Sequence, residues 1–266
     1  MPTARIDGID LAYEIMGTGP RVLFLNGSGG TMAQSRPLLG LVGDGVELLA
    51  FDQRGLGASG PAPGPYDMAR CAADALGLLD VVGWGSAVVL GVSFGGMVAQ
   101  ELAVTAPGRV ERLVLLCTSP GGAGGSSYPL HELDGMAPEQ LAEVRRTLLD
   151  SRFDEAWLDE HPGDRRLLEM MAPDDGVEEP AVTAGRRAQM AARRGHDVWD
   201  RLGAITCPTF VGCGRFDPIA PLVNSEAIVS RIPHAELHVY EGGHPFFVQD
   251  PKALPEIRDF LVGPDR

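Results

Sequence analysis

The stretch 90-LGVSFGGMVAQEL-102 places one serine, Ser93, where an apolar run changes into a helical pattern. Gly91 and Gly95 stand two residues before and after it, so that little side chain crowds the corner. A serine at such a strand-to-helix turn is held outward, and the next amide, at Phe94, can donate to a developing negative charge. Alternatively, the serine only caps the helix. The stretch therefore suggests that Ser93 is a nucleophile, and the residues that could act with it must decide between the two interpretations.

Length and charge narrow the classes of protein to consider. With 266 residues, 44% of them hydrophobic, and a mean hydropathy of +0.02, the chain suits one large globular domain, with or without an insertion. The net charge of −14 disfavours binding to nucleic acid or to an anionic membrane surface. The first residues have no signal-peptide pattern, and no run is apolar enough to cross a bilayer. We therefore expect a cytoplasmic protein.

Cysteine and lysine usage argue against several kinds of chemistry. The cysteines at 71, 117, 207 and 213 are scattered and predict buried, reduced thiols, without the paired spacing of a zinc site. Lys252 is the only lysine, which argues against Schiff-base or P-loop chemistry. We expect neither a metal ion nor a cofactor.

The two ends of the chain alternate short β-rich runs with helical patterns, which is typical of a mostly parallel sheet covered by helices. The predicted strands are residues 9–15, 21–25, 46–51, 86–92, 110–116, 208–213 and 235–240. The predicted helices are residues 66–82, 94–106, 220–231 and 251–262. Residues 1–120 and 203–266 are therefore expected to form one α/β core.

The middle of the chain, residues 121–202, has a different pattern. It opens with the flexible stretch GGAGGSS and continues with charged helical patterns such as APEQLAEVRRTLLDSRF. We interpret it as a helical cap, inserted between two strands and placed as a lid over the end of the sheet. The alternative is a helical packing layer with no role at a site.

A serine nucleophile needs a base, and the chain has six histidines. His131, His161 and His196 lie among charged residues of the insertion and are expected at the surface. His234 precedes a predicted strand, and His238 lies within it. His244, in YEGGHPFF, stands in a glycine-bordered loop directly after that strand, where its side chain can reach across the sheet edge. Unless it only anchors the last helix, His244 is the predicted base.

An acid must orient the base and stabilise its cation. In VGCGRFDPIAP, Asp217 follows the preceding predicted strand and should emerge at the same sheet edge. It could instead serve only as the start signal of the next helix. Three loops after different strands of one parallel sheet converge, and the order Ser93, Asp217, His244 is the nucleophile–acid–base order of this architecture.

A second donor to the oxyanion should come from the loop after an earlier strand. VLFLNGSGGT ends such a strand, and its Ser28 amide can lie close to Ser93. We interpret Gly27, Gly29 and Gly30 as giving the backbone room to approach a ligand. The loop does not match the glycine patterns of nucleotide-binding sites.

Taken in order, these motifs resemble those of the α/β-hydrolase superfamily over nearly the whole chain. The matching pieces are NGSGG at 26–30, FDQRGLGAS at 51–59, GVSFGG at 91–96, GRFDPIAP at 214–221 and GGHPFF at 242–247. The resemblance implies an eight-stranded, mainly parallel sheet with an inserted helical cap. It also implies Ser93 as nucleophile, Asp217 as acid, His244 as base, and the amides of Ser28 and Phe94 as the oxyanion hole.

Two details refine the resemblance. Many relatives have His-Gly where this chain has Asn26-Gly27, and asparagine here is similar to the enol-lactone hydrolases and the cofactor-free haloperoxidase-like esterases. Haloalkane dehalogenases and epoxide hydrolases are disfavoured because they carry aspartate at the position of Ser93. Asp52 and Arg54, in the family's FDQRGLGAS turn, are expected to be structural.

The substrate is expected to be a small to medium, mostly uncharged ester or lactone, cleaved through an acyl-enzyme on Ser93. Alternatives are a C–C bond hydrolase or thioesterase with the same triad, and a slow-turnover ligand receptor of the same fold. The chain could also form a homo-oligomer. The loop residues Asn26, Gly27 and Gly29 and several apolar side chains are candidates for lining the site, although ordinary core packing explains each apolar one equally well. The apolar candidates are Met32, Phe94, Met97, Trp157, Met170, Met171, Trp199 and Phe246.

Overall fold

In the computed structural model, which describes residues 1–62, 64–133, 135–171 and 180–263, eight strands form one sheet in the order β1-β2-β4-β3-β5-β6-β7-β8. β1 and β2 are antiparallel to their neighbours, and the strands from β4 to β8 pair in parallel. This confirms the predicted eight-stranded, mainly parallel sheet. The strands are β1 (Thr3–Ile6), β2 (Ile9–Gly17), β3 (Arg21–Leu25), β4 (Glu47–Phe51), β5 (Ala87–Val92), β6 (Val110–Leu116), β7 (Thr209–Gly214) and β8 (Ala235–Tyr240).

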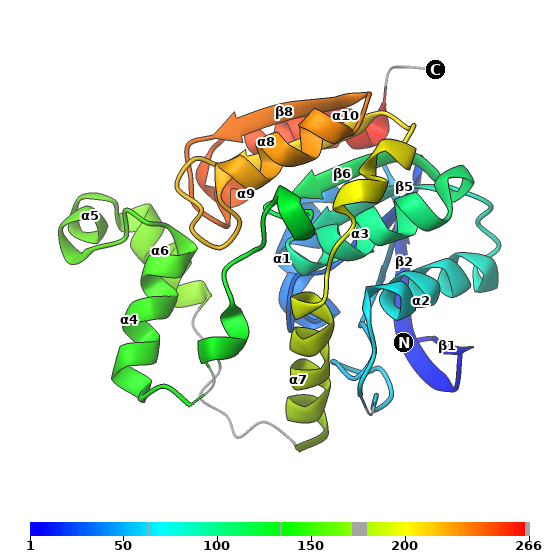
Figure 1. Cartoon of the computed structure of the whole chain (residues 1–266), viewed down its shortest axis with the longest axis horizontal. Coiled ribbons are helices and arrows are strands. Elements are labelled where there is room, and N and C mark those ends of the chain that lie inside the picture. The colour runs from blue at the N-terminus through cyan, green and yellow to red at the C-terminus, as the bar shows by residue number, and fades with distance from the viewer. Residues whose placement is uncertain (63, 134, 172–179, 264–266) are drawn as a thin grey trace.

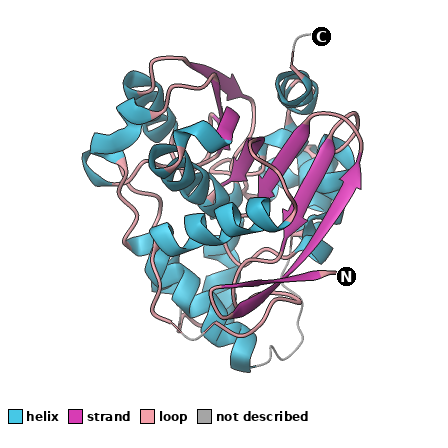
Figure 2. Ribbon diagram, turned by 90° about the vertical axis from the view of Figure 1, so that its right-hand side faces the viewer, coloured by secondary structure: helices cyan, strands magenta, loops and turns pink. Residues whose placement is uncertain are grey.

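Helices cover both faces of the sheet, which lies between them in Figure 2. Alternate residues of each strand point to opposite faces, so Leu23 packs toward α2, α3 and α8, while Val22 packs toward α1 and α10. Because both faces are covered, central strands such as β5 are apolar throughout and wholly buried. These helices are α1 (Met32–Val42), α2 (Met68–Val81), α3 (Phe94–Thr105), α8 (Leu222–Arg231) and α10 (Ala253–Val262). Among the described residues, no helix has both the length and the apolar character needed to cross a bilayer.

Two elements near the N-terminus were missed by the sequence analysis. β1 is only four residues long and joins β2 through Asp7-Gly8, both with positive φ, a two-residue hairpin turn that could have been recognised. α1 contains Pro37, which argues against a helix, but Thr31 and Gln34 form a capping box at its start. The spacing of Thr31 and Gln34 could have marked the start of this helix in the sequence.

Between β6 and β7, the described residues form helices and no strand of the sheet. Figure 1 shows α4, α5 and α6 grouped together, with α7 separate from them. α7 packs closely on the core, since a Cβ at Gly185 would lie 2.1 Å from the carbonyl oxygen of Gly55. Residues 172–179 of the predicted cap lie outside the described residues, and the lid role stays a prediction. The inserted helices are α4 (Pro138–Leu149), α5 (Glu155–Glu160), α6 (Pro162–Met170) and α7 (Pro180–Arg194).

Candidate active site

Ser93 joins β5 to α3 in a strained backbone conformation. Its φ is 54°, in the left-handed region that residues other than glycine rarely adopt. A Cβ at Gly91 would lie 2.4 Å from the carbonyl oxygen of Gly95, and a Cβ at Gly95 would lie 1.9 Å from that of Leu25. Only glycine fits at both positions. The pattern around Ser93 is thus a steric requirement of this turn.

The side chains of Ser93, His244 and Asp217 form a continuous hydrogen-bonded chain. Ser93 Oγ lies 3.0 Å from His244 Nε2, and His244 Nδ1 lies 2.8 Å from Asp217 Oδ2. The Asp217 side chain is fully buried and that of His244 is 14% exposed. Ser93 itself is only 7% exposed. A proton can pass from the hydroxyl to the imidazole, with the carboxylate fixing the orientation of the ring.

Asp217 has a second set of hydrogen bonds that fixes its position. Its Oδ1 accepts from the backbone amides of Ile219, at 2.8 Å, and Ala220, at 3.0 Å. One carboxylate oxygen therefore organises the turn before α8 while the other faces His244. Asp217 thus forms the turn before α8 and also contacts His244, and its role as the acid stays a prediction.

The loops that carry these side chains follow three parallel strands. Ser93 follows β5, Asp217 follows β7 and His244 follows β8, and β5 to β8 are consecutive in the sheet. Parallel strands end at the same edge, so residues 151 positions apart in sequence meet there.

The loop 26–30 lies against Ser93. A Cβ at Gly27 would be 3.7 Å from the Cβ of Ser93, so this backbone lies close to the candidate nucleophile. Asn26 orders the loop, because its Oδ1 accepts from the Gly27 amide and its Nδ2 donates to Ser35 Oγ and to the Thr31 carbonyl. Ser28 Oγ is buried and has no hydrogen-bond partner among the described residues. Asparagine therefore organises this loop where many relatives have histidine.

The amide of Phe94 opens α3, where backbone N–H groups have no partner within the helix. It is therefore a candidate donor to an oxyanion formed at Ser93. The Phe94 side chain, in contrast, is fully buried in the core. Only its backbone can serve the site.

The inserted helix α7 contributes a residue that the sequence analysis missed. Gln189 is buried, and its Oε1 accepts a 2.6 Å hydrogen bond from the Gly29 amide, next to Ser28. Gln53 connects to the same loop by donating from Nε2 to the Asn26 carbonyl at 2.8 Å. Contacts between residues 160 positions apart have no local sequence signal. α7 therefore belongs to the structure of the site.

Asp52 and Arg54 are bonded within the protein framework. Asp52 accepts from the backbone amides of Met32 and Ala58, which ties the loop after β4 to α1. Arg54 donates from Nε and Nη2 to the two carboxylate oxygens of buried Asp74, both at 2.5 Å. These contacts account for both side chains structurally, in line with the expectation from the sequence.

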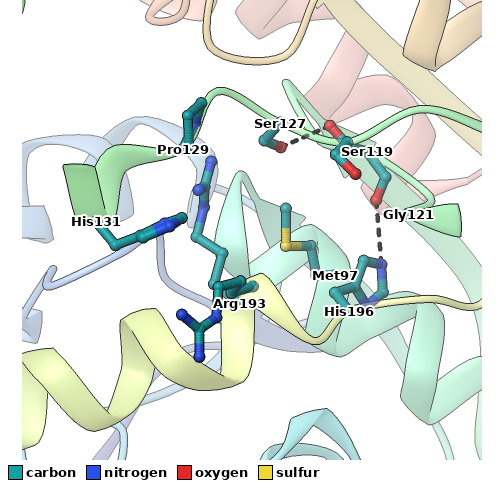
Figure 3. Close-up of a pocket in the computed structure, with 10 residues that line it drawn as sticks. Met97, Ser119, Gly121, Ser127, Pro129, His131, Arg193 and His196 are labelled. Atoms are coloured by element: carbon teal, nitrogen blue, oxygen red, sulfur yellow. Dashed lines mark hydrogen bonds between the residues drawn. The ribbon is translucent and has the colours of Figure 1, made fainter.

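A cavity of about 220 Å³ lies between α3, the loop after β6, and the inserted segment (Figure 3). Met97, four residues after Ser93 on α3, lines it as the sequence suggested. Its other lining residues are Ser119, Gly121, Ser126, Ser127, Pro129, His131, Arg193, Arg194 and His196.

Several apolar residues proposed for this pocket lie elsewhere. Phe246 is fully buried and stacks on Tyr240. Met32, the first residue of α1, packs into the hydrophobic core on the same side of the sheet. Trp157 stacks on His161 and on the Arg152 guanidinium within the insertion. Trp199 packs beside the core under Arg231. Met170 and Met171, 76% and 46% exposed, also lie outside the lining of the cavity.

Two further expectations need correction. His196 is 6% exposed and not a surface residue, because it follows α7 into the core, where Nε2 meets the Ser119 carbonyl at 3.1 Å. Cys207 is only partly buried. In the part of the chain that the structure describes, no group of three or more His, Cys, Asp or Glu side chains could hold a metal ion.

The fold and this geometry define a hydrolase of the α/β type, and sequence comparison gives the family. The family model described as the alpha/beta hydrolase fold matches residues 20–251, so the chain belongs to that family. It is 32% identical over 262 residues to RutD of Variovorax paradoxus (strain S110), a protein named for carbamate hydrolysis, with 95% of this chain and 96% of RutD covered.

Two other relatives support the assignment. The chain is 25% identical to 3-oxoadipate enol-lactonase 2 of Acinetobacter baylyi (strain ATCC 33305 / BD413 / ADP1), covering 95% of this chain and 92% of that protein. The solved structure of a hydrolase from Pseudomonas aeruginosa PA01 matches with a TM-score of 0.79 at 30% identity, over 99% of this chain and 98% of that one. The resemblance to enol-lactone hydrolases is confirmed.

Proposed function

We propose that the protein is a serine hydrolase that cleaves a small to medium carboxylic ester or lactone through an acyl-enzyme on Ser93. The observation that carries this proposal is the chain of hydrogen bonds from Ser93 Oγ to His244 Nε2 and from His244 Nδ1 to Asp217 Oδ2. A serine hydroxyl becomes a useful nucleophile when an oriented base removes its proton. In this proposal His244 is the base and Asp217 orients its ring.

The first half of the reaction forms the acyl-enzyme. His244 Nε2 takes the proton of Ser93 as Oγ bonds to the carbonyl carbon of the substrate. The negative charge that develops on the carbonyl oxygen is bound by the amides of Ser28 and Phe94. The tetrahedral intermediate then expels the alkoxide, which receives the proton from His244.

The second half restores the enzyme. His244 removes a proton from water, which attacks the acyl carbon, and the bond to Ser93 Oγ breaks as that oxygen recovers its proton. Asp217 stays ionised and stabilises the imidazolium in both halves. The hydrogen bonds of Asp217 to Ile219 and Ala220 hold it in place for this role.

Two of the relatives are named for acyl-type substrates. The enol-lactonase is named for a lactone, and RutD for a carbamate; both contain a carbonyl carbon bonded to a heteroatom that hydrolysis releases. A lactone would keep its leaving alkoxide within the same molecule, so one product carries both the new carboxylate and the hydroxyl. The cavity beside Met97 is the proposed place for the substrate's remaining atoms.

The test is covalent labelling of the intact protein with a fluorophosphonate, followed by mapping of the adduct by mass spectrometry. We expect one adduct, on Ser93, and none in Ser93→Ala or after heat denaturation. A parallel panel of short p-nitrophenyl esters, lactones and thioesters should show turnover at about 1–10³ s⁻¹ for its best oxygen ester or lactone. Preferred cleavage of thioesters, or labelling with negligible turnover of every substrate, would favour a thioesterase or a ligand receptor.

A further inference from the structure

Arg193, in the last turn of α7, is a buried cation without an anionic partner among the described residues. The residue is only 7% exposed, and its guanidinium donates one hydrogen bond, from Nη1 to the Tyr128 carbonyl at 2.7 Å. Its Nε and Nη2 are buried and have no hydrogen-bond partner in the part of the chain that the structure describes. Burial lowers the pKa of Arg193 to about 10, so the guanidinium is still charged at neutral pH. A buried, unpaired charge opposes folding, which calls for a reason to keep it.

The two unpartnered nitrogens are the pair that arginine uses for a carboxylate. Nε–H and Nη2–H point the same way and match the two oxygens of a carboxylate. The protein uses this pair twice elsewhere: Arg54 holds Asp74 with it, and Arg152 holds Asp150. Arg54 is as buried as Arg193, at 7% exposure. At Arg193 the same pair meets no carboxylate of the described chain.

The surroundings of Arg193 suit an anion. It lines the cavity of about 220 Å³, and none of the ten described residues that line this cavity is acidic, although the whole chain has 36 acidic residues. Figure 3 shows Arg193 with Pro129 and His131 on one side of the cavity and Met97 and His196 on the other. Arg194, Ser126 and Ser127 also line it.

Two helices connect the cavity with the candidate nucleophile, although neither Ser93 nor His244 is among the described residues that line it. On α3, Met97 follows Ser93 by four residues, which is about one helical turn. On α7, Gln189, which holds the Gly29 amide beside Ser28, precedes Arg193 by four residues. Arg193 and Gln189 therefore share a helix face, one turn apart, with Gln189 on the candidate oxyanion loop.

We propose that Arg193 binds a carboxylate of the substrate, so that the preferred substrate is an ester or lactone with a second, free carboxylate a few atoms from the scissile carbonyl. This inference rests on the proposed hydrolase function. It also revises the expectation of an uncharged substrate. The volume is below the 300–1,000 Å³ usual for drug-sized ligands, which favours a short carboxylate-bearing chain.

The test compares two esters with the same number of acyl carbons, mono-p-nitrophenyl glutarate and p-nitrophenyl pentanoate. We expect the wild-type protein to prefer the glutarate ester. Arg193→Gln should lower kcat/KM for the glutarate ester about 10- to 100-fold, the range of a lost charge-assisted hydrogen-bond pair, and change the pentanoate ester less than about threefold. Arg193→Lys keeps the charge but lacks the paired donors, so its kcat/KM for the glutarate ester should lie between those of the wild-type protein and Arg193→Gln. Arg187→Gln, an exposed arginine of the same helix, is the matched control and should leave both rates unchanged.

A second measurement separates recognition from catalysis and from folding. Free glutarate should raise the melting temperature of the wild-type protein, whereas neutral glutaramide should not, and Arg193→Gln should abolish the glutarate effect. Arg193→Gln alone should melt at the wild-type temperature or above it, because it removes an unpaired buried charge.

The results distinguish failure of each proposal. Equal loss of both ester activities, or a markedly lower melting temperature for Arg193→Gln, would show a structural role and overturn the inference. Ester turnover that depends neither on the substrate carboxylate nor on Arg193 would also overturn the inference, while the hydrolase proposal would stand. Arg193-dependent stabilisation by glutarate without turnover of any ester would uphold the anion site and overturn the hydrolase proposal.

Discussion

The backbone amide of His244 donates a 2.6 Å hydrogen bond to the carbonyl oxygen of Leu149, the last residue of α4. Two residues on, the amide of Ser151 donates to the Phe216 carbonyl, next to Asp217, at 3.0 Å. The inserted segment therefore holds the loops of both the candidate base and the candidate acid. It has a structural role at the candidate site, and its role as a lid stays a prediction.

Gln249 extends this connection and gives the first prediction. Its Oε1 accepts from the Gly243 amide at 2.8 Å, and its Nε2 donates to the carboxylates of Asp150, at 3.0 Å, and Asp164, at 3.2 Å. Gln249→Glu replaces this donor with a third carboxylate, which should displace the loop before His244. Because small misplacements of a reacting group are costly, we expect kcat to fall about tenfold with little change in KM. Steady-state kinetics with a p-nitrophenyl ester checks this, with Gln140→Glu on the exposed face of α4 as control. A change confined to KM would contradict the positioning role.

Asp217→Asn gives the second prediction. The amide oxygen can still accept from Ile219 and Ala220, so the turn before α8 should be retained. The amide nitrogen would then face His244 Nδ1 and favour the tautomer whose Nε2 carries the proton and cannot accept one from Ser93. We expect kcat to fall by about 10⁴ while the melting temperature changes by only a few degrees. Ester turnover and thermal melting of the same preparation test this, and near-normal turnover would exclude Asp217 as the acid.

Much of the sheet and the candidate triad could be predicted from the sequence because their signals are local. A strand pattern that ends in a glycine-containing loop marks the carboxyl end of a parallel strand. Ser93 and Asp217 follow the buried strands β5 and β7, and His244 follows the partly buried edge strand β8. Parallel pairing then brings the ends of such strands to one edge without further information. The architecture converts three local patterns into one site.

The insertion and the cavity could not be predicted in the same way. The contacts of Gln189 with Gly29 and of Leu149 with His244 depend on how the helices settle on the core. The burial of His196 and Arg193 was hidden by their charged neighbours in sequence, since a polar helix pattern predicts a solvated face. Phe246 illustrates the opposite case: an apolar residue near His244 that packs into the core and not toward a ligand.

Gly95→Ala gives the third prediction. The added Cβ would lie 1.9 Å from the carbonyl oxygen of Leu25 and 2.7 Å from that of Asn26, both backbone atoms that cannot rotate away. α3 and β3 would have to separate, so we expect a loss of about 3 kcal/mol in the free energy of unfolding and loss of ester turnover. Gly108→Ala is the control, because no atom lies within 4 Å of its added Cβ. Urea denaturation monitors stability, and wild-type stability together with activity in Gly95→Ala would contradict the steric explanation.

The fourth prediction concerns the stability of the fold in acid. Burial lowers the pKa of His196 to about 4; the carboxylates of Glu101 and Asp197 oppose this only in part, and Arg201 adds to it. In the unfolded chain the pKa is about 6.5, so between these values the unfolded state binds a proton that the folded state does not. The contribution of His196 to stability is therefore complete above about pH 6.5 and is lost as the pH falls toward 4.

His196→Gln isolates this effect, since its amide can keep a donor toward the Ser119 carbonyl but has no charge to gain. Between pH 7.5 and pH 5, we expect the wild-type protein to lose about 2 kcal/mol more of its free energy of unfolding than His196→Gln does. Urea titrations at the two pH values measure the difference. His234→Gln, at an exposed histidine, should lose as much stability as the wild type. Equal acid sensitivity of His196→Gln and the wild type would mean that other groups control the acid response.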